Sequence, residues 1–306
     1  MHLSQKSKRG VIVMFSHEFL SELSSLTVAI QRENENLRGD VRAKGSDGQD
    51  VVSGSDLRNE AGLRVLLRER VPALAFIYGE ENGFEQVSRN GTVGALIDPI
   101  DGTRSYACRI FYSAISVAFV NFAGQVVAGY IVSINNQHPD DLGVWTFDGE
   151  TTMHNGELYR PKTRIDDIKN ACISITSVSA YPKRSRDIAA IMFRLATERS
   201  RGPLSLCSGA MEILNVLQGN LGACINIGEE DIVSHAVAVE IAKSAGFHVR
   251  HVLTKGDDFT LLIDMEKGEI VPKVGASVLV CPKTISQAIE EIVEDAICSY
   301  EKERKC

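Results

Sequence analysis

The sequence lacks the cysteine patterns that mark zinc sites and disulfide frameworks. Its 306 residues include seven cysteines, an odd number, and no C-x-x-C pair. We therefore expect reduced thiols and a cytoplasmic protein. No apolar run reaches the eighteen residues of a membrane span, so we expect no membrane partner. The apolar run at 11–15 is too short for a signal peptide and is interpreted as a leader without a targeting role.

A long basic stripe is also missing. The formal net charge is −7, so we expect no nucleic-acid partner. A hydrophobic fraction of 44% with charges of both signs is typical of a globular chain and excludes disordered, collagen-like and disulfide-rich classes. An acidic protein repels a phosphorylated ligand unless bound cations reverse the local charge, which favours a metal-assisted site for such a ligand.

Several catalytic motifs are absent as well. The chain has no Walker A loop, no G-x-G-x-x-G, no G-x-S-x-G and no H-E-x-x-H. It has no D-x-D-x-T motif either, because Asp98 and Asp101 are three residues apart. Cys298 and Arg304 match a C-x5-R spacing, but the residues between them form a charged helical tail rather than a glycine-rich cradle. For phosphoryl chemistry these absences favour water as the nucleophile.

The hydrophobic pattern predicts helices and strands along the whole chain. Segment 16–37 is typical of an amphipathic helix capped by Ser16, and 57–70 of a second helix. The predicted strands of the first half are 73–78, 93–97, the hairpin 111–122 and 125–134, and 144–147. The second half predicts strands at 171–176, 222–227, 247–253, 260–264 and 276–281, and helices at 184–199, 208–218, 231–245 and 284–303. We expect an N-terminal α+β half (1–160) and a C-terminal α/β half (161–306).

Carboxylates follow two of the predicted strands. Glu80 and Glu81 come after the first strand, and Asp98 and Asp101 come after the second. Acids that crowd together raise one another's pKa unless a cation compensates, and Mg²⁺ with oxygen ligands does so well. Pro99 fixes its own φ and so helps Asp98, the Ile100 carbonyl and Asp101 to face one centre. An ordinary alternative stays open, since Asp-Gly is a common turn and Glu-Glu is usually solvated surface.

Together these segments resemble the inositol monophosphatase family. The resemblance is carried by Lys44, Asp50 and Asp56, by Gly79-Glu80-Glu81, by the D-P-I-D-G-T run from Asp98 to Thr103, and by Asp231. It implies a layered αβαβα fold of the inositol monophosphatase and fructose-1,6-bisphosphatase type, and a homodimer. It also implies Mg²⁺-dependent hydrolysis of a small phosphorylated metabolite, with inositol monophosphate or a sugar phosphate first. The alternatives are a 3′(2′),5′-bisphosphate nucleotidase, a fructose-1,6-bisphosphatase-like activity, and a catalytically silent metabolite-binding or regulatory relative.

The resemblance also implies roles for particular residues. Two to three Mg²⁺ ions per subunit would be held by Glu80, Asp98, the Ile100 carbonyl, Asp101 and Asp231. Thr103 and Asp56 would orient and help to deprotonate the attacking water, with Glu80 as a third catalytic residue. The predicted substrate-binding residues are Gly102, Thr103, Arg104, Ser208, Gly209, Asn226 and Asp231.

Three positions depart from the family pattern. Arg104 stands where the family commonly has Thr or a small residue, and Glu230 stands where Trp is usual. Cys207 replaces the leading Gly of the segment that lines the leaving-group pocket. Arg104 either grips a second anionic group of the substrate or points to solvent, and Glu230 suits the N-terminus of a helix. These differences concern the substrate more than the reaction.

Overall fold

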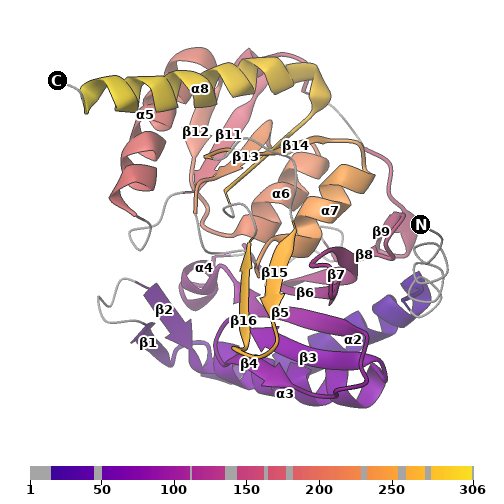
Figure 1. The fold of residues 1–306 in the computed structure, drawn as a ribbon. Helices are drawn as coiled ribbons and strands as arrows, with labels where there is room; N and C mark the ends of the chain where they lie inside the picture. Colours follow the sequence, from indigo (N-terminus) through magenta and orange to yellow (C-terminus); the bar gives the residue numbers. More distant parts are fainter. Residues whose placement is uncertain are drawn as a thin grey trace.

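Five layers make up the molecule, with helices outside and between two β-sheets (Figure 1). The computed structural model describes residues 15–44, 50–110, 112–134, 143–161, 165–176, 182–228, 233–253, 260–272 and 277–304, apart from the side chains of Asp50 and Pro272. The layers are a helix pair, an eight-stranded sheet, a second helix pair, a five-stranded sheet and a third helix pair. The predicted αβαβα class is thereby confirmed.

Serine side chains cap the first two of the described helices. Ser16 accepts a hydrogen bond from the Phe19 N–H at 3.2 Å, as its predicted role as N-cap requires. The helices are α2 (His17–Asn34), α3 (Gly54–Arg70), α4 (Thr103–Ala107), α5 (Lys183–Arg199), α6 (Gly209–Leu217), α7 (Ala236–Ser244) and α8 (Ser286–Glu303), with 3₁₀ turns η1 (Glu35–Leu37), η2 (Ile168–Asn170) and η3 (Lys283–Ile285). Within the described ranges, none of them combines the length and the apolar composition that crossing a bilayer demands.

The eight-stranded sheet carries the first group of acids. Its order is β10-β9-β8-β7-β6-β5-β3-β4, and β3 and β5 are parallel neighbours. Parallel pairing brings the carboxyl ends of both strands to one edge of the sheet, where Glu80 follows β3 and Asp98 lies near the end of β5. The strands are β3 (Leu74–Gly79), β4 (Gly83–Gln86), β5 (Val93–Asp101), β6 (Ser113–Asn121), β7 (Val126–Ile134), β8 (Val144–Phe147), β9 (Thr152–His154) and β10 (Glu157–Leu158).

The five-stranded sheet has the order β12-β11-β13-β17-β14. Its strands are β11 (Cys172–Thr176), β12 (Gly202–Leu204), β13 (Ala223–Asn226), β14 (His248–His251) and β17 (Val278–Cys281). Two hairpins stand apart from both sheets, β1 (Val41–Lys44) with β2 (Asp50–Ser53), and β15 (Leu261–Asp264) with β16 (Glu269–Pro272). The second hairpin ties the halves together, because the Leu261 N–H donates to the Gly124 carbonyl at 2.9 Å.

Three apolar clusters hold the layers together. One lies between α2, α3 and the large sheet, and includes the fully buried Leu63 and Phe119. A second joins α6 and α7 to both sheets, and a third packs α5 and α8 on the small sheet. Helices α6 and α7 therefore sit at the contact between the two halves, next to the edge where β5 ends (Figure 1).

The structure corrects several sequence predictions. Short strands were missed at β4, β9, β10, β12 and β16, since two to four residues carry too little periodicity to detect. The passage that precedes the second predicted helix has no predicted strand, but 41–44 and 50–53 pair there as β1 and β2. The helix predicted at 231–245 begins at Ala236 in α7.

Candidate active site

The end of β5 is irregular where its two aspartates lie. Asp98 pairs with Ser116 and Asp101 with Ala114 on β6, so the register shifts between them. Pro99 has no N–H to contribute to the ladder, which accounts for this break. The side chain of Asp98 turns back to accept from the Ile100 N–H at 3.0 Å. Both aspartates are almost fully buried, and the irregularity brings them to the start of α4.

Gly102 lets α4 begin directly after β5. Its φ of +84° is left-handed, a conformation that glycine adopts without steric cost. A Cβ on Gly102 would lie 2.9 Å from the Tyr112 carbonyl oxygen and 3.0 Å from the Ser208 Cβ. Any other residue would push apart β5 and the segment that carries Ser208.

Asp56 and Thr103 meet across 47 residues of sequence. The Thr103 hydroxyl lies 3.0 Å from Asp56 Oδ1 and 3.1 Å from the Ile100 carbonyl oxygen. Asp56 forms a capping box with Ser53 at the start of α3, in which its Oδ2 accepts from the Ser53 N–H at 2.8 Å. Burial raises the pKa of Asp56 to about 6, although the hydrogen bonds from Ser53 and Thr103 oppose this. The carboxyl group thus titrates close to neutral pH.

Glu80 and Glu81 lie on the turn after β3 and share one cation. The Lys44 Nζ is 3.0 Å from Glu80 Oε1 and 2.9 Å from Glu81 Oε1. Burial alone would lower the pKa of Lys44, but the charges of the two glutamates outweigh it and raise the pKa above its ordinary value. Burial, followed by repulsion from Glu80, raises the pKa of Glu81 to about 7 against the opposing effect of Lys44. The ammonium group therefore neutralises part of the acidic turn.

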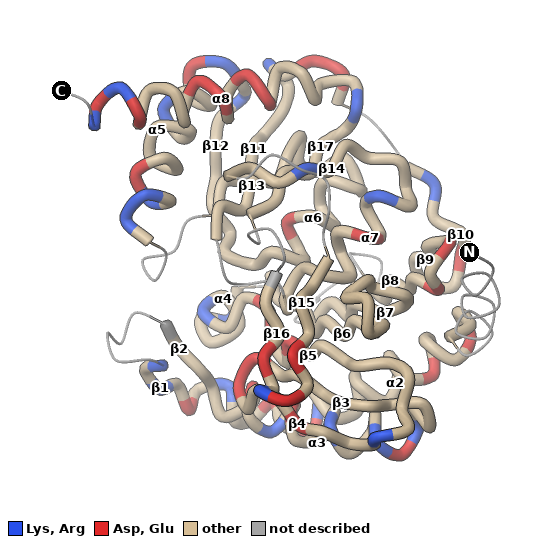
Figure 2. Tube along the Cα trace, viewed as in Figure 1, with Lys and Arg blue, Asp and Glu red and all other residues tan. Residues whose placement is uncertain are grey.

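Asp101 links the two halves of the molecule. Its carboxylate accepts from the Ser208 Oγ at 2.6 Å, the Gly209 N–H at 3.1 Å and the Ala210 N–H at 2.8 Å. These donors belong to the start of α6, more than a hundred residues further along the chain. Figure 2 shows acidic residues beside α4 and at α6, where the two halves face each other.

The other predicted substrate-binding residues surround this contact. Arg104 is exposed on the first turn of α4. Asn226 is buried at the end of β13, and its Oδ1 accepts from the Gly228 N–H at 2.8 Å. A Cβ on Gly209 would lie 3.5 Å from polar atoms of Asn226, Ser234 and His235. Ser208, Gly209 and Asn226 therefore lie together near Asp101.

Asp231 and Glu230 lie outside the described residues, so the structure does not place them. In the part of the chain that is described, no three His, Cys, Asp or Glu side chains converge closely enough to hold a metal ion. Glu80 forms an ion pair with Lys44, and Asp101 accepts a hydrogen bond from the N–H of Ala210 at the start of α6. The donor set still suits a hard cation, because Glu80, Asp98, Asp101 and the Ile100 carbonyl offer only oxygen atoms.

Two fully buried glutamates were missed by the sequence predictions. Glu60 in α3 accepts from the backbone of the turn that carries Glu80 and Glu81. Glu212 in α6 accepts from the Leu206 N–H at 3.1 Å and from the Thr176 hydroxyl, and burial raises its pKa above the ordinary value. The sequence does contain a hint of the position of Glu60. It lies one helical turn after Asp56 and therefore on the same face of the predicted helix.

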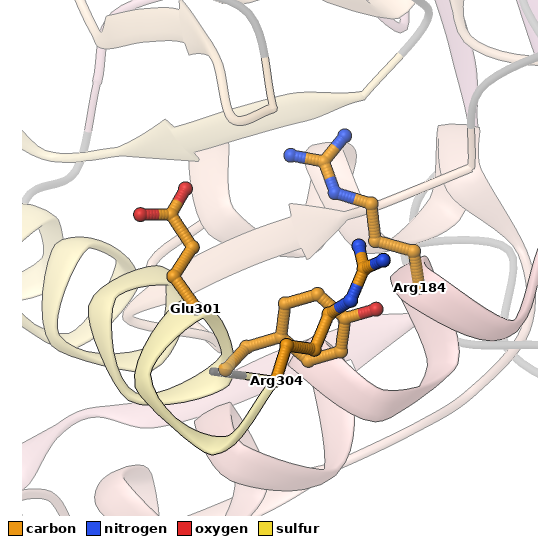
Figure 3. A pocket seen from close by; sticks show the side chains of 4 residues that line it. Arg184, Glu301 and Arg304 are labelled. Carbon is orange, nitrogen blue, oxygen red and sulfur yellow. The ribbon is translucent and has the colours of Figure 1, made fainter. Parts of the chain in front are cut away.

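A cleft of about 580 Å³ lies on the far side of the small sheet, between α5 and α8. Figure 3 shows Arg184, Glu301 and Arg304 around it. None of its lining residues is among the predicted site residues, and the cleft is separated from β5 by the small sheet and the α6/α7 layer. It is therefore distinct from the candidate active site.

Two curated proteins are similar to part of this chain. Inositol monophosphatase 1 of Rattus norvegicus is 27% identical over 191 residues, which span 62% of this chain and 66% of the rat protein. The inositol-1-monophosphatase of Aeropyrum pernix is 29% identical over 37% of this chain and 43% of its own length. The chain thus spans less than two thirds of either curated relative.

Solved structures share the fold at low identity. The extragenic suppressor protein suhB of Bartonella henselae superposes with a TM-score of 0.70 and 19% identity, over 94% of this chain and 98% of the other. SaIMPase-II bound to inositol monophosphate gives a TM-score of 0.64 and 19% identity, over 92% and 97% of the two chains. The same protein bound to 2′AMP gives 0.63 and 18%, over 94% and 96%. A family profile, described as the inositol monophosphatase family, matches residues 18–294, and the chain therefore belongs to that family.

Proposed function

We propose that this protein is a Mg²⁺-dependent phosphatase that hydrolyses a small phosphate monoester. The observation that carries the proposal is the hydrogen bond between Thr103 and Asp56, formed beside the two buried aspartates at the end of β5. A hydroxyl paired with a buried carboxylate is suited to orient a water molecule and to take its proton. Family membership supports the same reaction class.

Asp56 has the acidity that such a role needs. A general base works best when its pKa is near the operating pH, and the pKa of Asp56 is raised to about 6. Ser53 fixes one side of the Asp56 carboxylate and Thr103 contacts the other. Water would then attack phosphorus in line, with no covalent enzyme intermediate.

Glu80, Asp98, Asp101 and the Ile100 carbonyl would hold Mg²⁺, with Asp231 as a further ligand. Bound Mg²⁺ would supply Lewis-acid stabilisation of the charge that develops on the phosphate and the leaving group. The N–H groups at 102–104 are the predicted contacts for phosphate oxygens. Two to three ions per subunit stay the expected number.

Inositol monophosphate or a sugar phosphate is the substrate that we place first. The support comes from the relatives, since SaIMPase-II has been crystallised with inositol monophosphate and with 2′AMP. A bisphosphate nucleotide and fructose 1,6-bisphosphate stay the alternatives, and the predicted homodimer can be checked by light scattering.

The test measures phosphate release from inositol, hexose, pentose and nucleotide phosphates with and without Mg²⁺. We expect turnover of at least one monoester that stops when EDTA removes the metal. Turnover that is equal in EDTA would contradict the metal requirement, and no turnover of any compound would favour the catalytically silent alternative.

Asp98→Asn provides the matching variant. Asp98 is almost fully buried, and its replacement keeps the side-chain shape while removing the charge that Mg²⁺ needs. We expect a loss of turnover of about a thousandfold or more. The control is Asp166→Asn on the surface, which should keep wild-type activity. An Asp98→Asn enzyme with most of its activity would show that Asp98 is not a ligand.

A further inference from the structure

Glu60 is a fully buried carboxylate directly beneath the turn that carries Glu80 and Glu81. Its Oε2 accepts from the Glu81 N–H at 2.8 Å, and its Oε1 accepts from the Asn82 N–H at 3.1 Å. The side chain comes from α3, one helical turn after Asp56. Two successive backbone groups of the 80–82 turn are therefore held by one side chain.

The charge of Glu60 is balanced by Arg64. The Arg64 Nε and Nη2 lie 2.9 Å and 2.8 Å from Glu60 Oε1, one helical turn away. Arg64 also donates to the Gly83 carbonyl at 2.7 Å and to Glu85 at 2.8 Å. A buried carboxylate is costly unless it is paired and hydrogen-bonded, and here both conditions are met. Glu60 and Arg64 thus hold the backbone of the turn from 81 to 83.

Gly79 shows how close this contact is. A Cβ at Gly79 would overlap the carboxylate of Glu60, so the residue before Glu80 has no room for a side chain. The backbone of Gly79 itself is part of β3 and pairs with Gly83 and Ile97. The need for glycine at this position therefore comes from the approach of Glu60.

We propose that Glu60 is a positioning residue that sets the Mg²⁺ affinity of the site by fixing the backbone of the 80–82 turn. This inference rests on the proposed function, since Glu80 is a predicted metal ligand. Glu80 is partly exposed, and its side chain contacts Lys44 at 3.0 Å. The rigid element beneath it is the backbone held by Glu60. Residues that orient metal ligands typically change metal affinity by about 10- to 100-fold when they are replaced.

The test compares Glu60→Gln with the wild type in three measurements. Hydrogen exchange of the metal-free protein should be faster in peptides that cover residues 79–83, because Gln offers one acceptor oxygen for two N–H groups. Calorimetric titration with Mg²⁺ should show affinity about tenfold weaker. Kinetics should show a higher Mg²⁺ requirement with little change in the KM for the phosphate substrate at saturating Mg²⁺.

Glu85→Gln is the matched control. Glu85 contacts the same Arg64 at 2.8 Å and also Arg68 at 2.9 Å, but its carboxylate does not contact the N–H groups of 81 and 82. It should lower thermal stability less than Glu60→Gln does, because Glu85 is partly exposed, while leaving Mg²⁺ affinity within twofold of the wild type. Equal Mg²⁺ affinities for wild type and Glu60→Gln would overturn the inference.

Gly79→Ala tests the same contact from the other side. The added methyl group must displace the Glu60 carboxylate, so this variant should show the same faster exchange and weaker Mg²⁺ binding. If Glu60→Gln does not fold, Gly79→Ala replaces it in the test. Wild-type Mg²⁺ affinity in Gly79→Ala would then overturn the inference. A wild-type protein that neither binds Mg²⁺ nor releases phosphate would instead contradict the proposed function.

Discussion

The two ends of the candidate site hold their acids by different means. At the 80–82 turn, Glu60, Glu80 and Glu81 contact the cations Arg64 and Lys44. At the junction of β5 and α4, Asp56 and Asp101 accept hydrogen bonds from hydroxyl and backbone N–H groups. Neutral donors stabilise a carboxylate without cancelling its charge. The β5 end therefore keeps the stronger need for an added cation.

Glu212, in the second half of the molecule, also accepts hydrogen bonds from neutral groups rather than from a cation. It is as deeply buried as Glu60, but the Leu206 N–H and the Thr176 hydroxyl are neutral donors. Burial raises its pKa, as expected for a carboxyl group in an apolar layer. The segment from 206 to 210 is thus held by Glu212 on one side and by Asp101 on the other.

The largest effect should follow the loss of Asp101, since its carboxylate joins the β5 end of the site to the second half of the molecule. Asp101→Ala leaves three donors of the Ser208–Ala210 segment without their acceptor and removes a predicted ligand. We expect turnover to fall by about a thousandfold and the free energy of unfolding to fall by about 3 kcal/mol. Phosphate-release assays and urea denaturation measure the two losses.

Asp101→Asn separates the charge from the hydrogen bonds. Its amide oxygen keeps one acceptor, so we expect a loss of stability of only about 1 kcal/mol with the same loss of turnover. If Asp101→Ala unfolds at the same urea concentration as the wild type, the link between the halves contributes nothing to stability. That result would contradict a stabilising role for the neutral donors around Asp101.

The next effect concerns the pH dependence of the metal-free protein. The pKa of Asp56 rises from 3.8 to about 6 on folding, so its contribution to stability is complete below pH 4 and is lost as the pH rises through 6. A rise of this size in the pKa corresponds to a loss of at most about 3 kcal/mol. Asp56→Asn should remove this loss, so that the free energy of unfolding in EDTA falls less steeply between pH 4 and 7.

The matched control for Asp56→Asn is again Asp166→Asn. Asp166 is exposed, so this variant should keep the wild-type dependence of the free energy of unfolding on pH. Added Mg²⁺ should reverse the loss in the wild type, because a nearby cation favours the ionised form of Asp56. If the free energy of unfolding falls equally with pH in the wild type and in Asp56→Asn, folding does not disfavour the charged form of this carboxyl group.

The sequence predicts one end of the site better than the other. Asp98, Asp101 and Thr103 lie within six residues, and the apolar strand before them makes their position at a sheet edge predictable. The partners of Asp101 lie 107 to 109 residues away, and no local pattern indicates that contact. Glu60 was missed because a glutamate on a helix usually faces solvent, whereas here it lies against the 80–82 turn.

The smallest effect should come from Cys207, which precedes Ser208 and so adjoins the segment whose hydroxyl and N–H groups donate to Asp101. Its φ of 55° is left-handed, where residues with a side chain are strained. Cys207→Gly should raise the free energy of unfolding by about 0.5 to 1 kcal/mol, since the relief of strain exceeds the added entropy of the unfolded chain. Cys207→Ala removes the thiol without relieving the backbone, so it should leave stability unchanged. Both variants should keep the hydrogen bond from Ser208 to Asp101, so turnover should stay within twofold of the wild type. A Cys207→Gly variant that is less stable than Cys207→Ala would show that the left-handed backbone at 207 is not a source of strain.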